Sequence, residues 1–136
     1  MIVDTSALLA YFDANEPTHA QVAAVIDGAS EPLVISPFVI AELDYLVLTR
    51  HGSRVEQLVL DELVSGAWDL AEFGADRLRA AAEIVRSYRD VPIGVTDASL
   101  VVLASSYRTD RVATLDRRHF SALRLPNGNP IRILPD

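Results

Sequence analysis

Short apolar runs alternate with longer segments of helical periodicity along the whole chain. The short runs are bounded by polar or turn residues, which is typical of buried strands. They are Ile2–Asp4, Leu33–Ser36, Trp68–Phe73, Arg111–Thr114 and Ile131–Leu134. Between them, apolar residues recur at spacings of three and four, which predicts helices. These helices are Ser6–Phe12, Thr18–Ile26, Phe38–Arg50, Ser53–Val64, Ala75–Tyr88 and one that begins at Thr96.

Residues at the element boundaries agree with this division. Gly28 and Gly52 follow the second and third helices, where glycine commonly ends a helix. Pro37 suits a first helical turn, and Thr5 or Ser6 can cap the first helix. Strands separated by helices predict an α/β fold with a mostly parallel sheet that is covered on both faces. The length of 136 residues fits one domain over the whole chain.

Four acidic residues occupy positions that are typical of functional sites in parallel sheets, at strand ends or near the starts of helices. Asp4 closes the first strand, Asp116 follows the strand that ends at Thr114, and Asp97 lies in the first turn of its helix. Glu42 lies about one turn into an otherwise apolar helix, where a buried carboxylate is costly without a counter-charge. In open parallel sheets, ligands bind beyond the carboxyl ends of the strands. We therefore expect these four acids to face one site.

Converging carboxylates need a compensating cation. Each close pair repels by roughly 4 kcal/mol at an intermediate dielectric, and the pKa values rise unless a cation is present. A hard divalent ion such as Mg²⁺ is the natural partner, because it prefers oxygen ligands and substrate phosphates. Taken singly, the same acids have plainer roles. Asp4 and Asp97 suit helix caps or dipole partners, Asp116 suits a turn or local ion pair, and Glu42 suits a polar helix stripe.

Composition narrows the chemistry further. The chain has no Cys, and all 12 of its basic residues are Arg. These absences exclude disulfides, zinc-thiolate sites, thiol nucleophiles, Walker-A phosphate binding and Schiff-base chemistry. The net charge of −7 argues against a protein that binds nucleic acid through a basic surface. However, residues 1–76 carry −11 and residues 77–136 carry +4. This asymmetry fits either solvated arginines on helix faces or a cationic rim beside an acidic centre.

Four segments together resemble the PIN-domain ribonucleases, and more narrowly the VapC-type toxins of bacterial type II toxin–antitoxin pairs. The segments are IVDTSALLAYF, SPFVIAELDYL, VTDASLVVLA and VATLDRRHF, and they occur in the family's order. The resemblance covers essentially the whole chain. It implies a three-layer α/β/α sandwich with a central, mostly parallel sheet and an acidic pocket at the carboxyl edge of that sheet.

The resemblance also implies which acids bind metal. The residues that match the family's catalytic and metal-binding acids are Asp4, Glu42, Asp97 and Asp116. The expected cofactor is Mg²⁺, with Mn²⁺ as an alternative. His119 stands where many relatives carry another acid, so the number of metal ions, one or two, stays open. We leave His119 out of the core site, since such a histidine more often lies in a loop or on the surface.

Further residues are assigned to the substrate. Thr5, Ser6 and Thr114 match small hydroxyl positions near the metal or the scissile phosphate. Arg117 and Arg118 lie beside the site in sequence, where they contact RNA phosphates or pair with local acids. The expected reaction is in-line hydrolysis of RNA by a metal-activated water. Family behaviour implies 5′-phosphate and 3′-hydroxyl products.

Two alternative functions are compatible with parts of this pattern. A haloacid-dehalogenase-type phosphatase also places an Asp after its first strand. That chemistry needs a second Asp where this chain has Ser6, and it normally needs a Lys, which the chain lacks. The other alternative is a catalytically inactive PIN-like module that binds RNA or protein. The presence of all four acids argues against it.

The apolar helices Thr18–Ile26 and Phe38–Leu48 suggest protein partners. Most of their side chains are expected in the core, and the resemblance implies a second use in a homodimer interface and a groove for a small antitoxin. An Arg or Lys of the antitoxin would then enter the carboxylate site. No apolar stretch approaches the ~20 residues that span a bilayer, and no signal peptide is visible. We therefore expect a cytoplasmic protein with no membrane partner.

Overall fold

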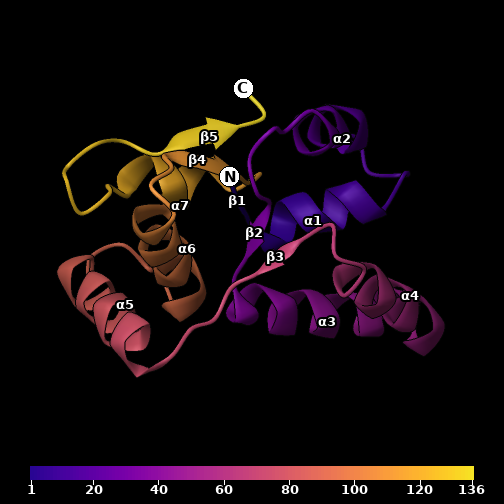
Figure 1. The fold of residues 1–136 in the computed structure, drawn as a ribbon, viewed down its shortest axis with the longest axis horizontal. Helices are drawn as coiled ribbons and strands as arrows, with labels where there is room; N and C mark the ends of the chain where they lie inside the picture. The colour runs from indigo at the N-terminus through magenta and orange to yellow at the C-terminus, as the bar shows by residue number, and fades with distance from the viewer.

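A five-stranded sheet forms the centre of the protein, whose residues 1–136 are all described by a computed structural model (Figure 1). The strands are β1 (Ile2–Val3), β2 (Val34–Ile35), β3 (Asp69–Leu70), β4 (Arg111–Ala113) and β5 (Arg132–Leu134). Their order is β3-β2-β1-β4-β5, and every pairing is parallel. The prediction of a mostly parallel sheet is therefore confirmed, and the five strands are the five that the apolar runs predicted.

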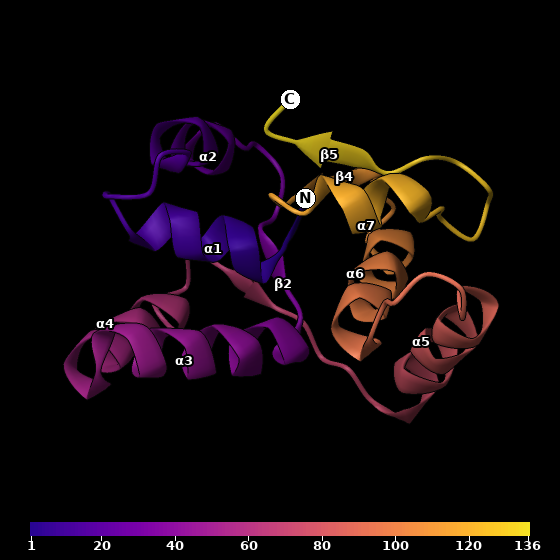
Figure 2. The ribbon, with the colours of Figure 1, turned by 180° about the vertical axis from the view of Figure 1, so that it is seen from behind.

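Seven helices connect and cover these strands in an α/β sandwich. They are α1 (Thr5–Phe12), α2 (His19–Asp27), α3 (Pro37–His51), α4 (Ser53–Leu63), α5 (Ala75–Ser87), α6 (Val95–Ser106) and α7 (Arg117–Ala122). Both views show α4 and α5 towards opposite ends of the molecule, with the strands between them (Figures 1 and 2). α6 packs against β1 and β4 at the centre of the sheet. None of the helices is long and apolar enough to cross a membrane.

Burial is most complete in two central strands and in α6. Both residues of β1 and both of β2 are fully buried, and every residue from Ala98 to Ala104 in α6 is buried. Strands that are covered on both faces need apolar residues at every position rather than at alternate ones. The central sheet and α6 thus form one core, in which most of the buried polar side chains lie where the strands end.

Two local expectations need correction. No helix was predicted after Thr114, but α7 forms there because the Asp116 side chain accepts a hydrogen bond from the His119 backbone N–H at 3.1 Å. Such an N-cap satisfies a backbone donor that a short helix otherwise leaves unpaired. The cap of α1 is Asp4, which the sequence also suggested, and neither Thr5 nor Ser6. Both caps are acids that the sequence also singled out for chemistry.

Candidate active site at the carboxyl edge of the sheet

The carboxyl ends of β1 and β4 are adjacent because these two strands pair directly. The backbone N–H of Asp4 donates to the carbonyl of Ala113 at 2.9 Å, which continues the ladder one residue beyond β1. Asp4 and Thr114 are therefore the residues that follow β1 and β4, and they lie side by side at the carboxyl edge of the sheet. Both side chains are buried, so this point of the edge is a polar cluster set into the core.

Asp4 is held by hydrogen bonds to both of its carboxyl oxygens. One oxygen accepts the Thr5 backbone N–H at 2.8 Å, and the other accepts the hydroxyls of Thr114 at 2.7 Å and Ser6 at 3.2 Å. Burial nevertheless raises the pKa of Asp4 above its usual value, with the nearby charge of Glu42 adding to the effect while the hydrogen bonds oppose it. The carboxyl group is thus fixed in direction but short of positive charge.

The two hydroxyls also tie the following loop to Asp4. The Ser6 hydroxyl accepts the Leu115 backbone N–H at 2.9 Å, and the Thr114 hydroxyl accepts that of Asp116 at 3.0 Å. Each hydroxyl therefore donates to the carboxylate and accepts from the backbone after β4. The structure brings the predicted residues Asp4, Ser6 and Thr114 into direct contact. Thr5 lies beside them, and its hydroxyl is buried without a hydrogen-bond partner.

Asp97 enters the cluster from the first turn of α6. Its pKa is raised from 3.8 to about 6, chiefly by burial and then by the charge of Asp4, with smaller contributions from Asp116 and Glu42 and an opposing one from His119. Burial alone raises the pKa of a carboxyl group, and neighbouring negative charges add to that effect. The four acids therefore act on one another, as expected from their positions along the chain.

Glu42 differs from the expectation in its exposure. The sequence placed it in an apolar helix where burial would be costly, but in α3 it lies on the exposed side. The buried positions of that helix are Val39, Leu43 and Val47, which are spaced four residues apart and form one stripe along the helix. From the exposed side, the charge of Glu42 still raises the pKa of both Asp4 and Asp97. Glu42 is therefore the exposed member of the acidic site, by which we mean the group formed by Asp4, Glu42, Asp97 and Asp116.

His119 is the residue whose place the sequence analysis missed. Its Nδ1 lies 2.7 Å from an Asp116 carboxyl oxygen and 3.8 Å from one of Asp97. The spacing of three residues puts Asp116 and His119 on one face of the helical turn. Recognising Asp116 as the cap of a helix would have revealed this contact. His119 therefore lies beside the acidic site and is its nearest positively chargeable group.

The arginines near the site have different surroundings. The Arg117 guanidinium donates to the carbonyl of Pro135 and so holds the C-terminal segment. Arg118 is exposed and takes no part in the ion pairs of the protein. Elsewhere in the basic half, Arg79, Arg86 and Arg111 pair with acids. Of the two arginines beside the site, Arg118 is therefore the better candidate for the cationic rim, because Arg117 is occupied by its contact with Pro135.

The acidic site has the donor atoms and the charge for a hard divalent ion. Its acids supply carboxylate oxygens, which Mg²⁺ and Mn²⁺ prefer, and burial together with the charges of neighbouring acids raises the pKa values of Asp4 and Asp97. In the positions that the side chains occupy, no three His, Asp or Glu residues are grouped as metal ligands. The donor chemistry fits a metal ion, and ligation requires the side chains to draw together.

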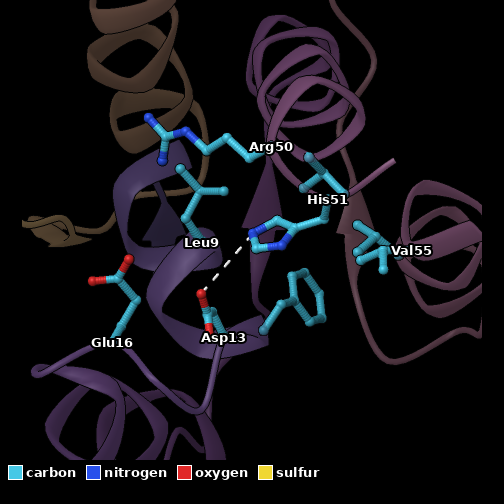
Figure 3. A pocket seen from close by; sticks show the side chains of 9 residues that line it. Leu9, Asp13, Glu16, Arg50, His51 and Val55 are labelled. Carbon is cyan, nitrogen blue, oxygen red and sulfur yellow. Dashed lines mark ion pairs between the residues drawn. The ribbon is translucent and has the colours of Figure 1, made fainter. Parts of the chain in front are cut away.

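A second hollow lies away from these acids, among α1, α3 and α4 (Figure 3). It has a volume of about 140 Å³. Its apolar lining consists of Leu9, Phe12, Val47, Val55 and Val59, and its polar rim of Asp13, Glu16, Arg50 and His51. His51 and Asp13 face each other across it at 4.0 Å. This hollow contains none of the candidate catalytic residues.

Comparison with known proteins places the chain in a family. Residues 1–124 match the PIN domain. The chain is 57% identical over 135 residues to ribonuclease VapC26 of Mycobacterium tuberculosis, covering 99% of this chain and 100% of that protein.

Solved structures show the same fold. VapC20 of Mycobacterium tuberculosis, described as a sarcin-ricin loop cleaving toxin, superposes with a TM-score of 0.79 at 19% identity, over 87% of this chain and 91% of that one. DNA-bound VapBC of Salmonella typhimurium superposes with a TM-score of 0.73 at 17% identity, over 97% and 96%. The chain belongs to the PIN domain family and, within it, to the VapC proteins.

Proposed function

We propose that this protein is a metal-dependent endoribonuclease and the toxin of a type II toxin–antitoxin pair. The observation that carries the proposal is the gathering of four carboxylates, whose charges act on Asp97, at the carboxyl edge of a parallel sheet, with the His119 imidazole beside two of them. The full-length similarity to a protein named as a ribonuclease supports the same activity. The inactive PIN-like module is the second candidate, and the test below separates the two.

The residues proposed to hold Mg²⁺, or alternatively Mn²⁺, are Asp4, Glu42, Asp97 and Asp116. When bound, such an ion supplies a Lewis acid that lowers the pKa of an attacking water and stabilises charge on the phosphate. Asp4 presents a carboxylate whose direction is fixed by Thr5, Ser6 and Thr114. Asp97 must give up its proton before it can bind a cation, which links the reaction to a pKa of about 6.

Substrate contacts follow from charge and exposure. Arg118 is proposed to contact an RNA phosphate, because it is exposed, lies two residues after Asp116 and forms no ion pair. Arg117 was assigned the same role from the sequence. Its contact with Pro135 gives it a structural task, so we expect it to contribute to RNA binding chiefly by long-range charge. Thr5 offers its unpartnered buried hydroxyl within the same cluster.

We propose that a small antitoxin docks on the hollow among α1, α3 and α4. Two of the structural relatives are VapBC proteins of Salmonella typhimurium and Rickettsia felis, described as bound to DNA. Around the hollow, α3 and α4 expose the apolar side chains of Tyr45, Leu48, Val55 and Leu58. An apolar antitoxin side chain suits the lining, and an antitoxin Arg or Lys suits Asp13 and Glu16 at the rim. The α2 helix, which the sequence also suggested, exposes no large apolar side chain.

A homodimer is also proposed, and light scattering of the purified protein tests it. Co-expression with the neighbouring open reading frame tests the antitoxin. If the two proteins do not copurify and the second does not inhibit RNA cleavage, the antitoxin proposal fails.

The activity is tested by incubating the purified protein with a mixed RNA pool in Mg²⁺, in Mn²⁺ and in EDTA. We expect cleavage that EDTA abolishes. The variant Asp4→Asn should be inactive, whereas Asp110→Asn, an exposed acid at the opposite edge of the sheet, is the matched control and should cleave normally. Cleavage by Asp4→Asn at the wild-type rate would contradict the site assignment. Binding of RNA by the wild type without cleavage in either metal would favour the inactive module.

A further inference from the structure

We propose that Ser36 and Ser99 are positioning residues that hold Glu42 and Asp97 at a fixed separation in the acidic site. The inference rests on the proposed metal-dependent function and extends it to two residues outside the carboxylate cluster. Ser36 is the N-cap of α3, six residues before Glu42, and Ser99 lies two residues after Asp97 in α6. The two serines therefore join the helices that carry these acids.

Their hydrogen bonds run in one direction from α3 to α6. The Phe38 backbone N–H donates to the Ser36 hydroxyl at 3.2 Å, which caps α3. The Ser99 hydroxyl donates to the Thr96 carbonyl at 2.6 Å. Since the only hydrogen of Ser99 is used in that bond, the 2.7 Å contact between the two serines must have Ser36 as its donor. The chain of bonds ends on the residue next to Asp97.

The burial of these hydroxyls sets them apart from the rest of the core. The protein has five buried polar or charged residues, namely Asp4, Thr5, Ser36, Ser99 and Thr114. Three of them lie at the acidic site. The remaining two are Ser36 and Ser99, which are fully buried and bond to each other. Burying a hydroxyl costs free energy unless it is hydrogen-bonded, whereas an alanine at either position would bury no polar group and would not incur that cost.

The serine pair connects two helices, α3 and α6, whose relative position is not fixed by a short connection in the chain. α3 follows β2 and α6 precedes β4, so no short loop fixes one against the other. The start of α3 lies beside α6 in both views (Figures 1 and 2). Apolar contacts resist separation of two helices but permit sliding, whereas a short hydrogen bond with defined direction fixes their register. Metal ligands from two elements need this accuracy, on the order of 0.5 Å.

The first test measures metal affinity without RNA. Mn²⁺ binding to the metal-free protein is followed by electron paramagnetic resonance for the wild type, for Ser99→Ala and for Val22→Ala. Val22 is fully buried in α2, which carries none of the proposed metal ligands, so its truncation is a matched control for lost stability. We expect Ser99→Ala to bind Mn²⁺ about tenfold more weakly, as for other residues that orient metal ligands, and Val22→Ala to bind normally. Equal losses in both variants, or none in a folded Ser99→Ala, would overturn the proposal.

A second measurement needs no metal and keeps this inference separate from the proposed activity. Because the chain has no Cys, spin labels can be attached through Tyr45→Cys in α3 and Ser106→Cys in α6, both exposed positions. The distance between the labels should show a narrow distribution with Ser99 present and a broader one after Ser99→Ala. An unchanged distribution contradicts the positioning role, even if the wild type cleaves RNA. A wild type that cleaves no RNA but shows both effects contradicts the proposed activity alone.

Discussion

At the amino edge of the sheet, Glu31 is surrounded by positive charge, whereas at the carboxyl edge four carboxylates have a single imidazole nearby. The Glu31 carboxylate lies 2.9 Å from the backbone ammonium group of Met1 and 2.6 Å from the Arg111 guanidinium. At the other edge, burial together with the charges of the neighbouring acids raises the pKa of Asp97 to about 6. The same strands thus connect a charge-balanced edge to an edge with unbalanced charge.

The difference separates a structural use of charge from a functional one. A paired, partly buried carboxylate supports the fold, and removing one partner leaves the other uncompensated. Unpaired carboxylates do the reverse, because they raise the free energy of the folded protein until a cation binds. Substitutions at the two edges should therefore affect stability in opposite directions.

The largest expected effect is at the carboxyl edge. Asp97→Asn should lower metal-dependent RNA cleavage by about 10³-fold or more, since a lost metal contact costs several kcal/mol in the transition state. The same change should stabilise the metal-free protein by ~1–2 kcal/mol, after allowance for solvent screening of a partly exposed carboxyl. Cleavage assays and thermal denaturation measure the two effects. A destabilised Asp97→Asn would show that the acids are already compensated.

The pH dependence of the wild type provides a second comparison. The pKa of Asp97 is about 6 in the folded protein, against 3.8 for an unperturbed aspartate. Between these values the folded state binds a proton that the unfolded state releases, so the metal-free protein should become more stable as the pH falls from 6 towards 4, and lose this contribution above 6. Metal binding competes with the proton, so cleavage should fall about tenfold per pH unit below 6.

Denaturant titrations of the metal-free protein between pH 4.5 and 7.5 check the first effect, with Asp97→Asn as the control that should lack it. Cleavage rates at constant Mg²⁺ check the second. If the free energy of unfolding instead fell steadily with decreasing pH in both proteins, Asp97 would not be responsible for the pH dependence.

At the amino edge, Glu31→Gln should destabilise the protein by ~1–2 kcal/mol, because Arg111 and the Met1 ammonium group lose their counter-charge. Chemical denaturation measures the loss. Mn²⁺ affinity of the folded variant should match the wild type. If Glu31→Gln weakened metal binding as much as a change in the acidic site does, the two edges would not be separate in function.

The smallest expected effect concerns the rim. Arg118→Ala should weaken RNA binding a few-fold and reduce the slope of log affinity against log salt by about one, as expected for one lost phosphate contact. The turnover rate at saturating RNA should stay unchanged. Arg79→Ala, which removes an arginine paired with Asp76 on α5, is the control. An equal effect in both variants would indicate general attraction rather than a contact at the site.

The sequence could place the candidate acids because strand ends and helix starts are local properties. Asp4, Asp97 and Asp116 each follow a strand or begin a helix, and a parallel sheet brings such positions to one edge. For Glu42 the sequence left two possibilities open, a costly buried carboxylate and a polar helix stripe, and the structure has the second, because the stripe of Val39, Leu43 and Val47 faces the core.

Other features depend on packing that no local pattern encodes. The contact of Ser36 with Ser99 arises because α3 and α6 pack together, although the two serines are 63 positions apart in the sequence. The contact of Arg117 with Pro135 requires the C-terminal segment to pass α7. His119 was within reach of prediction, because the spacing to Asp116 is helical, but the segment is short and polar and shows no apolar periodicity.

The brevity of the strands gives the two edges a shared electrostatic environment. β4 spans three residues from Arg111 to Ala113, or ~10 Å at the rise of an extended chain. That length is close to the ~8 Å over which salt at physiological ionic strength screens charge. The core between the edges is a thin low-dielectric slab, and a change of charge on one side reaches the other more strongly as the salt concentration falls. Ionic strength is therefore a physical control on the affinity of the acidic site for cations, without any movement of the fold.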